Sequence, residues 1–515
     1  MLVIFTSNNA SKTITNRQIS PTPAPPVVIL PPGARRLRCI AWRGTGQCRP
    51  NGPREPQNDK NCSEIIAPGM SGFCEVVDTD TGEQLQVMRR HCNSVKGNVK
   101  FRCADAPAFA NYPIEGQAAV EKVLVPGFSL PHVAGGGQPR DGIVMVVYPK
   151  LLASAYATIR VLHDVLHCRL PIEIWFHVDE IEEDSMLLTP LQELGKFIGD
   201  ISYHPIYEPR AKGFLSKVFA IYNSYFDRIL FLDADNVPVR DPSYLFTTPE
   251  FEASGAVFWP DFWHPRRTLF NLHARSILWE LLDSPFVDMM EQESGQLLVD
   301  RTRHAAPLEL VYFYSFHEPN LIEKLDVVYG DKDLFRLAWM KLKTPFHMIE
   351  ALPAMAGREI NGSFCGMTMV QHDVNGDVLF MHRNQHKLTG ERDKKMEKAA
   401  FENTVVPPEK ALGFPQLDGY PDPVIWTHIL SFRKNAYRHL YTIDAYRADP
   451  QFPQWQPCYG RRYVAKQRLF ELLTFSNYSF AGIETDIRRF AFEAAQLLLA
   501  QNVTWGDNFS NTTSD

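Results

Sequence analysis

Residues 228–236 read Arg-Ile-Leu-Phe-Leu-Asp-Ala-Asp-Asn, and this stretch decides the fold of the chain. Its first five residues predict a buried strand, which runs directly into Asp233 and Asp235. Aspartates after a strand often enter a turn, because their side chains bond to nearby backbone amides. At the carboxyl edge of a parallel sheet, the same pair would instead be placed to bind a metal ion and a phosphate. The surrounding sequence has to distinguish these two possibilities.

Strands and helices alternate on the N-terminal side of this stretch. The apolar runs and the helical spacing of Leu152, Ala155, Ile159, Leu162 and Leu166 predict strands at 142–148, 171–178 and 199–206, and helices at 151–168 and 214–226. Such alternation is typical of parallel βαβ units in a three-layer α/β/α domain with a mostly parallel central sheet. Ligands of such sheets bind beyond the carboxyl ends of the strands, where Asp233 and Asp235 lie.

Composition changes along the chain predict five segments. We expect a disordered, proline-rich stalk at 1–37, a cysteine-rich module at 38–108, the α/β domain at 141–395, a C-terminal extension packed on it at 396–500, and a disordered tail at 501–515. Glycines and a proline between residues 133 and 142 indicate a short hinge before the α/β domain.

The cysteine-rich module favours disulfides. Six of the nine cysteines cluster there: Cys39, Cys48, Cys62, Cys74, Cys92 and Cys103. An even cluster in a Gly/Pro-rich segment predicts a disulfide framework, for which about 15 pairings are possible. Zinc is the alternative, but its closely spaced Cys-x₂-Cys pairs do not occur. Disulfides place the protein in an oxidising compartment.

The net charge and the targeting signals bear on three kinds of partner or location: nucleic acid, the secretory pathway and the membrane. The 515 residues carry a net charge of −6 and no basic stripe with interleaved aromatic residues, which argues against nucleic acid. Seven Asn-x-Ser/Thr triplets agree with a secretory location. Residues 1–5, MLVIF, are too short for a signal peptide or a membrane span. We therefore expect membrane association only through a leader or anchor that this sequence does not contain.

A series of motifs resembles a known family. Residues 207–246, which contain the opening stretch, are followed by GAVFWPDFW (255–263), ESGQLLVD (293–300), GDKDLFRLAW (330–339) and FMHRNQHK (380–387). In this order they resemble the fungal Golgi α-mannosyltransferases of the Mnn type and, more distantly, the glycogenin-like retaining glycosyltransferases. The resemblance covers roughly residues 141–395 and implies a GT-A fold, GDP-mannose as donor and the Golgi lumen as location. The fungal enzymes lack the cysteine-rich module, for which a lectin-like or docking role and a plain stabilising cap are both open.

The resemblance implies a metal site. Asp233 and Asp235 match the metal-binding pair, and His382 matches the late histidine that completes the ligand set in glycogenin-like enzymes. An imidazole ligand favours Mn²⁺, with Mg²⁺ as the alternative. Lys387 would contact the donor diphosphate as a point charge. From the residues alone, a core histidine bonded to backbone is the favoured interpretation of His382, and a solvated lysine is the alternative for Lys387.

Further side chains are assigned to the donor and to catalysis. We expect Lys217, Asp233, Asp261, Gln296 and Lys387 to bind the donor. Trp259 and Trp263 either stack on sugar rings or belong to the core. Asp333 is the candidate beside the reacting carbon, with Asp331 and Glu293 as further catalytic candidates.

The resulting hypothesis is a metal-dependent retaining glycosyltransferase. It would transfer mannose from GDP-mannose to an oligosaccharide or glycoprotein acceptor in the secretory pathway, as a type II membrane protein in its complete form. A UDP-sugar donor is the nearest alternative. A catalytically silent, secreted carbohydrate-binding protein is the alternative of another class, because a fold alone does not establish an activity.

Overall fold

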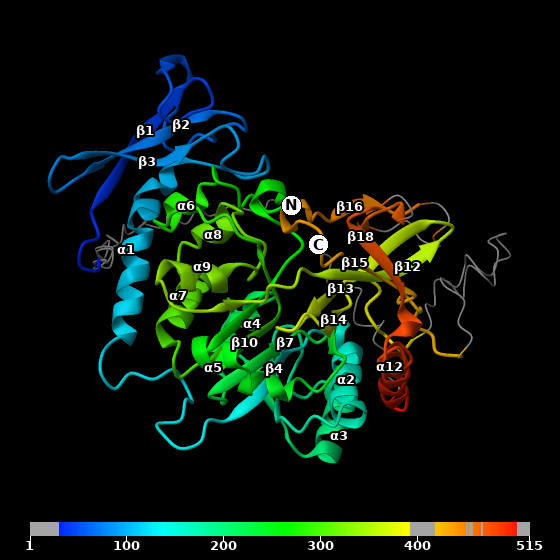
Figure 1. Ribbon diagram of the computed structural model, residues 1–515. Helices are drawn as coiled ribbons and strands as arrows, with labels where there is room; N and C mark the ends of the chain where they lie inside the picture. The colour runs from blue at the N-terminus through cyan, green and yellow to red at the C-terminus, as the bar shows by residue number, and fades with distance from the viewer. Residues whose placement is uncertain (1–29, 392–417, 450–451, 453–456, 465–466, 502–515) are drawn as a thin grey trace, which may run out of the picture.

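The computed structural model describes residues 30–391, 418–449, 452, 457–464 and 467–501 (Figure 1). Most of the predicted stalk and nearly all of the predicted tail lie outside the described residues. Within the described part of the chain, no helix combines the length and the apolar character needed to cross a membrane.

The centre of the molecule is a seven-stranded sheet. Its order is β11 (His347–Met348), β9 (Ala256–Pro260), β10 (Gln292–Asp300), β7 (Arg228–Leu232), β4 (Asp141–Val146), β5 (Ile172–His177) and β6 (Ile201–Ile206). Strands β7, β4, β5 and β6 are parallel, whereas β10 runs antiparallel to both of its neighbours. The residues that follow β7 and β4 therefore lie at one shared edge of the sheet.

Helices cover both faces of this sheet (Figure 1). Along β4, Ile143 and Met145 point into the core formed with α2 (Leu152–Arg160), α3 (Thr189–Ile198) and α12 (Ile483–Leu499). Val144 and Val146 point into the core on the opposite face. That core is formed with α1 (Ala106–Val123), α4 (Leu215–Asn223), α7 (Ala305–Phe316) and α9 (Leu334–Lys341). Side chains alternate across a strand, so an apolar run such as β4 fits only a sheet that is buried on both faces. The predicted three-layer, GT-A-like α/β fold is confirmed.

A second sheet lies beside the first. It runs in the order β16 (Asp444–Arg447), β17 (Pro457–Gly460), β13 (Ser363–His372), β12 (Ala354–Ile360), β15 (His428–Phe432) and β18 (Phe470–Thr474), and β14 (Val378–His382) joins β13 to β8 (Asn236–Pro238). Strands from residues 428–474 thus complete a sheet begun by residues 354–382. The disulfide Cys365–Cys458 links β13 to β17, and the sequence did not predict it.

The cysteine-rich module is a small antiparallel sheet. Its strands are β1 (Leu37–Thr45), β2 (Ser71–Asp78) and β3 (Gln84–Arg90). Three disulfides, Cys39–Cys62, Cys48–Cys92 and Cys74–Cys103, use all six clustered cysteines, which confirms the disulfide framework and leaves none for zinc. Cys168 is the one free cysteine and is buried.

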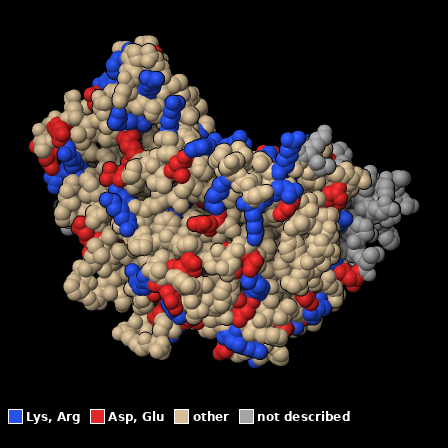
Figure 2. Space-filling view, viewed as in Figure 1, with Lys and Arg blue, Asp and Glu red and all other residues tan. Residues whose placement is uncertain are grey.

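Ion pairs connect this module to the body of the molecule, which the two larger sheets and their helices form. Figure 2 shows basic and acidic side chains interspersed over the drawn face. Lys96 Nζ lies 2.9 Å from Asp326 Oδ1, and Lys324, at the end of α8 (Leu321–Lys324), contacts Asp105. The module is therefore attached to the body by side chains as well as by the continuous chain.

Candidate active site

Asp233 and Asp235 lie where the chain passes from the first sheet to the second. β7 ends at Leu232, and the Asp233 backbone N–H donates to the Gly295 carbonyl of β10. The Asn236 N–H then donates to the Asp233 carbonyl, which closes a tight turn into β8. The Asn236 side chain fixes this turn, because its amide donates to the carbonyl of Gly295 and to the side chain of Gln296. Both carboxylates consequently lie at the carboxyl edge of the parallel strands.

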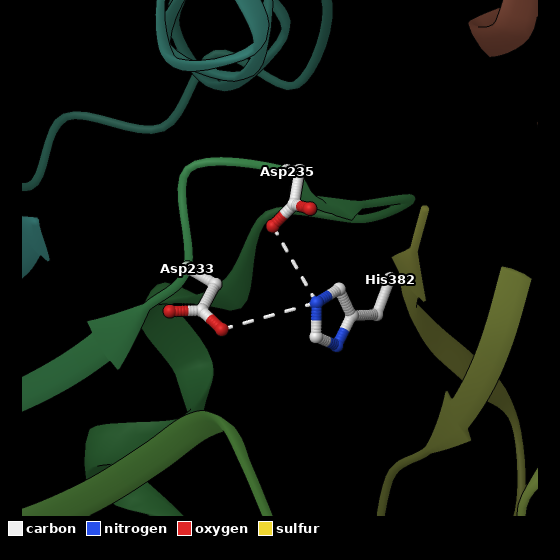
Figure 3. A group of neighbouring side chains, drawn as sticks. All are labelled: Asp233, Asp235 and His382. Atoms are coloured by element: carbon white, nitrogen blue, oxygen red, sulfur yellow. Dashed lines mark ion pairs between the residues drawn. The ribbon is translucent and has the colours of Figure 1, made fainter. Parts of the chain in front are cut away.

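His382 reaches this turn through strand pairing. β14 runs antiparallel to β8, and His382 lies opposite Asn236, while the Arg383 N–H donates to the Asp235 carbonyl. His382 Nε2 lies 3.4 Å from Asp235 Oδ1 and 3.8 Å from Asp233 Oδ2 (Figure 3). The structure therefore brings together the three residues predicted to bind a metal ion.

The geometry and charge of this group fit a divalent ion. One potential ligand atom from each of Asp233, Asp235 and His382 lies within 4.8 Å of the others, and ligands of a first-row metal lie about 2.0–2.3 Å from the ion. Two carboxylates and an imidazole are a ligand set that manganese accepts. Around them, four carboxylates face two ammonium groups: Asp233, Asp235, Glu293 and Asp331 against Lys217 and Lys387. With the histidine neutral, a divalent cation would balance the excess negative charge.

Lys217 joins Asp233 to Asp331. Its Nζ atom lies 2.8 Å from Asp233 Oδ2 and 3.8 Å from Asp331 Oδ1, and its side chain is buried. Burial alone would lower the pKa of Lys217, but the two carboxylates outweigh it and raise that pKa. Burial raises the pKa of Asp331 to about 6, against the opposing effect of Lys217. Asp331 Oδ2 is buried without a hydrogen-bond partner among the described residues, although most buried polar atoms have one.

Lys387 lies on the other side of the turn. Its ammonium group contacts Asp235 Oδ2 and donates to the Arg383 carbonyl at 2.8 Å. Arg383 is itself buried and pairs with Glu484 of α12 at 3.2 Å. The C-terminal helix thereby holds the segment that carries both His382 and Lys387.

Glu293 contacts the histidine from behind. Glu293 Oε1 lies 3.4 Å from His382 Nδ1, the ring nitrogen that faces away from the aspartates. Burial would raise the pKa of Glu293, but His382 and its other partners lower it, which keeps the carboxylate ionised. Glu293 is thus placed to orient the His382 ring, as a carboxylate on the far nitrogen does for metal-binding histidines. Gly295 leaves the space for this contact, since a Cβ atom there would lie 2.6 Å from His382 Nδ1.

Asp333 and Asp261 belong to a neighbouring buried cluster. Lys332 Nζ lies 3.1 Å from Asp261 Oδ2 and 3.0 Å from Asp333 Oδ2, and it also contacts Glu291. Asp333 Oδ1 accepts from the Gln292 N–H and from Arg336, so both oxygens of Asp333 are engaged. This engagement favours Asp331 over Asp333 as the carboxylate available to a substrate.

The same cluster shows what sequence reasoning missed. Lys332 and Glu291 were not predicted, because Lys332 stands between two aspartates and Glu291 precedes Gln292 and Glu293, as exposed charged residues commonly do. Burial raises the pKa of Asp261 to about 7, although Lys332 opposes the shift. Trp259 is fully buried and Trp263 nearly so, which places both indoles in the core.

A family model matches the central part of the chain. Residues 140–373, just under half of the chain, match the family described as "Mannosyltransferase putative". The matched stretch contains Asp233, Asp235, Glu293 and Asp331 and ends before His382.

Several curated proteins are similar to the chain. The α-1,2-mannosyltransferase MNN5 of Saccharomyces cerevisiae is 27% identical over 320 residues, which cover 51% of this chain and 53% of that protein. The α-1,2-mannosyltransferase MNN24 of Candida albicans is 29% identical over 246 residues, 41% of this chain and 34% of that protein. The chain spans about half the length of the first of these relatives, and less of the second.

Solved structures include the mannosyltransferase Ktr4p from S. cerevisiae. It is 11% identical, covers 50% of this chain and 82% of its own, and superposes with a TM-score of 0.29. The fold assignment rests on the sheet order described above. The family match and the curated relatives confirm the resemblance that the sequence motifs predicted: over its central half, this chain resembles the fungal Mnn-type mannosyltransferases.

Proposed function

We propose that this chain is a metal-dependent retaining α-mannosyltransferase that moves mannose from GDP-mannose to a mannosylated glycan. The observation that carries the proposal is the convergence of Asp233, Asp235 and His382 beside Lys217 and Lys387, at the carboxyl edge of the parallel strands. Relatives named α-1,2-mannosyltransferases make the α-1,2 linkage the first to test.

The donor diphosphate fits between the metal ligands and Lys387. Asp233, Asp235 and His382 would hold Mn²⁺, or Mg²⁺ as the alternative ion, and Glu293 would orient the histidine ring. When bound, the ion supplies positive charge to the departing diphosphate. The Lys387 ammonium group supplies a second positive charge at the same place, and such electrostatic stabilisation commonly contributes more to catalysis than any other effect.

The mannose ring would lie toward Lys217 and Asp331. The unpartnered Asp331 Oδ2 accepts a hydrogen bond from a sugar hydroxyl, and Lys217 holds Asp331 and Asp233 in fixed positions. We infer retention through departure and attack on one face. The acceptor oxygen bonds to the anomeric carbon as the bond to diphosphate breaks, and the acceptor proton passes to the diphosphate. Holding both substrates in that geometry is the main task of the surrounding residues.

The disulfides support a location in the secretory pathway. Eight of the nine cysteines are paired, which requires an oxidising compartment such as the one that leads to the Golgi lumen.

A donor screen tests the proposal. The purified protein is incubated with Mn²⁺, α-mannobiose and one donor at a time, and release of GDP from GDP-mannose is compared with release of UDP from UDP-glucose, UDP-galactose and UDP-xylose. We expect release from GDP-mannose only, lost on chelation and reduced at least ~1,000-fold in Asp235→Asn, because the interactions are made with the leaving group. Release of UDP instead would show that the donor is a UDP-sugar and not GDP-mannose. No release from any donor, with mannobiose still bound, would favour the carbohydrate-binding protein.

A further inference from the structure

Three aromatic rings form a partly exposed array beside the candidate active site. The ring of Tyr329 lies 5.4 Å from that of Phe214 and 5.1 Å from that of Phe270, measured between centroids. Tyr329 is 52% exposed and Phe214 is 45% exposed. Exposed apolar residues are usually scattered singly, so a contiguous array of rings indicates a binding surface. Aromatic faces are suited to the apolar faces of sugar rings.

This array is joined to both charged clusters of the site. Lys217 Nζ, which pairs with Asp233, lies 5.7 Å from the centre of the Phe214 ring. Lys332 Nζ, which pairs with Asp261, lies 4.4 Å from the centre of the Phe270 ring. The array therefore lies next to the place proposed for the donor sugar.

The backbone of the array is shaped for this packing. Gly330 separates Tyr329 from Asp331 and has a φ of +57°. A Cβ atom there would lie 2.6–2.9 Å from the Phe214 side chain. A glycine is required at this position, because it combines left-handed backbone with close approach of an aromatic ring.

A groove lies between the cysteine-rich module and the region of α8, and Lys96 links it to the array. Lys96 of the module lies with its Nζ atom 5.9 Å from the Phe270 ring centre and 2.9 Å from Asp326, which lines the groove. The groove has a volume of about 700 Å³. Its polar wall is made by side chains of both charges from the module and from the region of α8: Lys100, Arg102, Asp105, Glu323, Lys324 and Asp326. Interspersed donors and acceptors suit a ligand with many hydroxyl groups.

The module side of the groove is held in place. The Ser94 carbonyl accepts from the Asn271 side chain at 2.8 Å and from the Ile277 N–H at 3.1 Å. The Arg89 N–H donates to Glu280 at 2.8 Å. Together with the disulfides, these bonds fix the wall relative to the active site, so that a ligand can be bound across the boundary between module and body.

We propose that Phe214, Phe270 and Tyr329 bind the reactive end of the acceptor glycan, and that the groove between the module and α8 binds its more distant sugar residues. The cysteine-rich module is then part of the acceptor site. This inference rests on the proposed transfer of mannose and adds where the acceptor binds and why the module is present.

Acceptor kinetics test the aromatic array. Initial rates are measured for methyl α-mannoside and for a linear α-linked mannotetraose, each with saturating GDP-mannose. In Tyr329→Ala we expect KM for both acceptors to rise about tenfold, the size of one lost ring contact. The kcat value and the KM for GDP-mannose should stay within about twofold. Phe197→Ala is the matched control, since Phe197 is 74% exposed on α3, which packs on the opposite face of the central sheet from α4, and should leave all four constants unchanged. A rise confined to the KM for GDP-mannose would overturn the assignment, because it would mean that the array binds the nucleotide base of the donor.

Acceptor length tests the groove. In the double variant Lys100→Ser, Arg102→Ser, we expect KM for mannotetraose to rise at least about threefold while KM for methyl α-mannoside is unchanged, because only the longer acceptor reaches the groove. Equal effects on the two acceptors, or no effect on either, would remove the module from the acceptor site.

Direct binding separates failure of this inference from failure of the proposed function. Binding of mannotetraose without donor or metal is followed by saturation-transfer NMR in the wild-type protein and in Tyr329→Ala. Binding that weakens in the variant supports the array even if no donor is cleaved. Transfer from GDP-mannose with tetraose kinetics and binding unaffected by Tyr329→Ala would overturn the array and leave the proposed function standing.

Discussion

His382 lies opposite Asn236 in the antiparallel pairing of β14 with β8, which places the histidine ring beside Asp235. Register fixes this contact, because a slip of one residue would turn the histidine to the other face of the strand. The candidate metal site is therefore held by backbone hydrogen bonds within the second sheet as well as by its own side chains.

Gly295→Ala tests whether His382 binds the metal. The new Cβ atom would meet only side-chain atoms, His382 Nδ1 at 2.6 Å and Glu293 Oε1 at 2.9 Å, so the fold can persist while both side chains move. We expect Mn²⁺ affinity, measured by titration calorimetry, to fall roughly 10- to 100-fold, as for the loss of a partner that orients a ligand. Gly482→Ala is the control, since nothing lies within 4 Å of a Cβ atom there. An unchanged affinity in Gly295→Ala would argue that His382 is not a ligand.

Glu484→Ala tests the support that α12 gives to the segment that carries His382 and Lys387. Glu484 pairs with buried Arg383 and accepts from the backbone N–H groups of Ile425 and Trp426. Leaving Arg383 unpaired should lower the free energy of unfolding in urea by about 3–5 kcal/mol. Asp486→Ala, on the same helix, removes only a partly exposed pair with Arg489 and should cost less than about 1 kcal/mol. Equal losses in the two variants would contradict the special role of Glu484.

Asp261→Asn should change how stability depends on pH. Burial raises the pKa of Asp261 to about 7 in the folded protein, above the ordinary value of 3.8 that applies when the chain is unfolded. The folded state therefore favours the protonated carboxyl. The contribution of the protonated Asp261 carboxyl to stability is complete below about pH 4 and is lost as the pH rises through 7. Asparagine cannot ionise, so the variant should gain stability relative to the wild type across this range, on the order of 2–4 kcal/mol. Thermal melting of both proteins from pH 4 to pH 8 measures the gain, and a constant difference would refute it.

Thiol titration tests the disulfide assignment. The folded protein should show no rapidly reacting thiol, because eight cysteines are paired and Cys168 is buried. Unfolding in guanidinium without reductant should expose one thiol, and reduction should expose all nine. Six additional reactive thiols before reduction would mean that the module is not cross-linked.

The local pattern of apolar residues was enough to predict the strand before Asp233 and the helices around it. The position of His382 followed only from family resemblance, because it depends on the pairing of β14 with β8, and nothing in the residues next to His382 records that partner. The sequence offered no pairing for Cys365 and Cys458 for the same reason, since 93 positions separate them.

The cluster around Lys332 was missed for a different reason. Charged residues are nearly always exposed, so nothing in the sequence singled out Glu291 and Lys332, and Asp333 was expected beside the reacting carbon. Tertiary packing buries all three together, and only the assembled structure shows that they satisfy one another.

The interleaving of the two sheets also sets an order of assembly during synthesis. The module can close its three disulfides once residue 103 has emerged, and β7, the strand just before Asp233, is synthesised later. The sheet that holds His382 needs strands as far as Thr474, and Arg383 needs Glu484. The histidine is therefore fixed only when nearly all of the described chain has left the ribosome. A polypeptide that stops before β18 carries the aspartates and His382, but not the complete sheet that holds the histidine beside them.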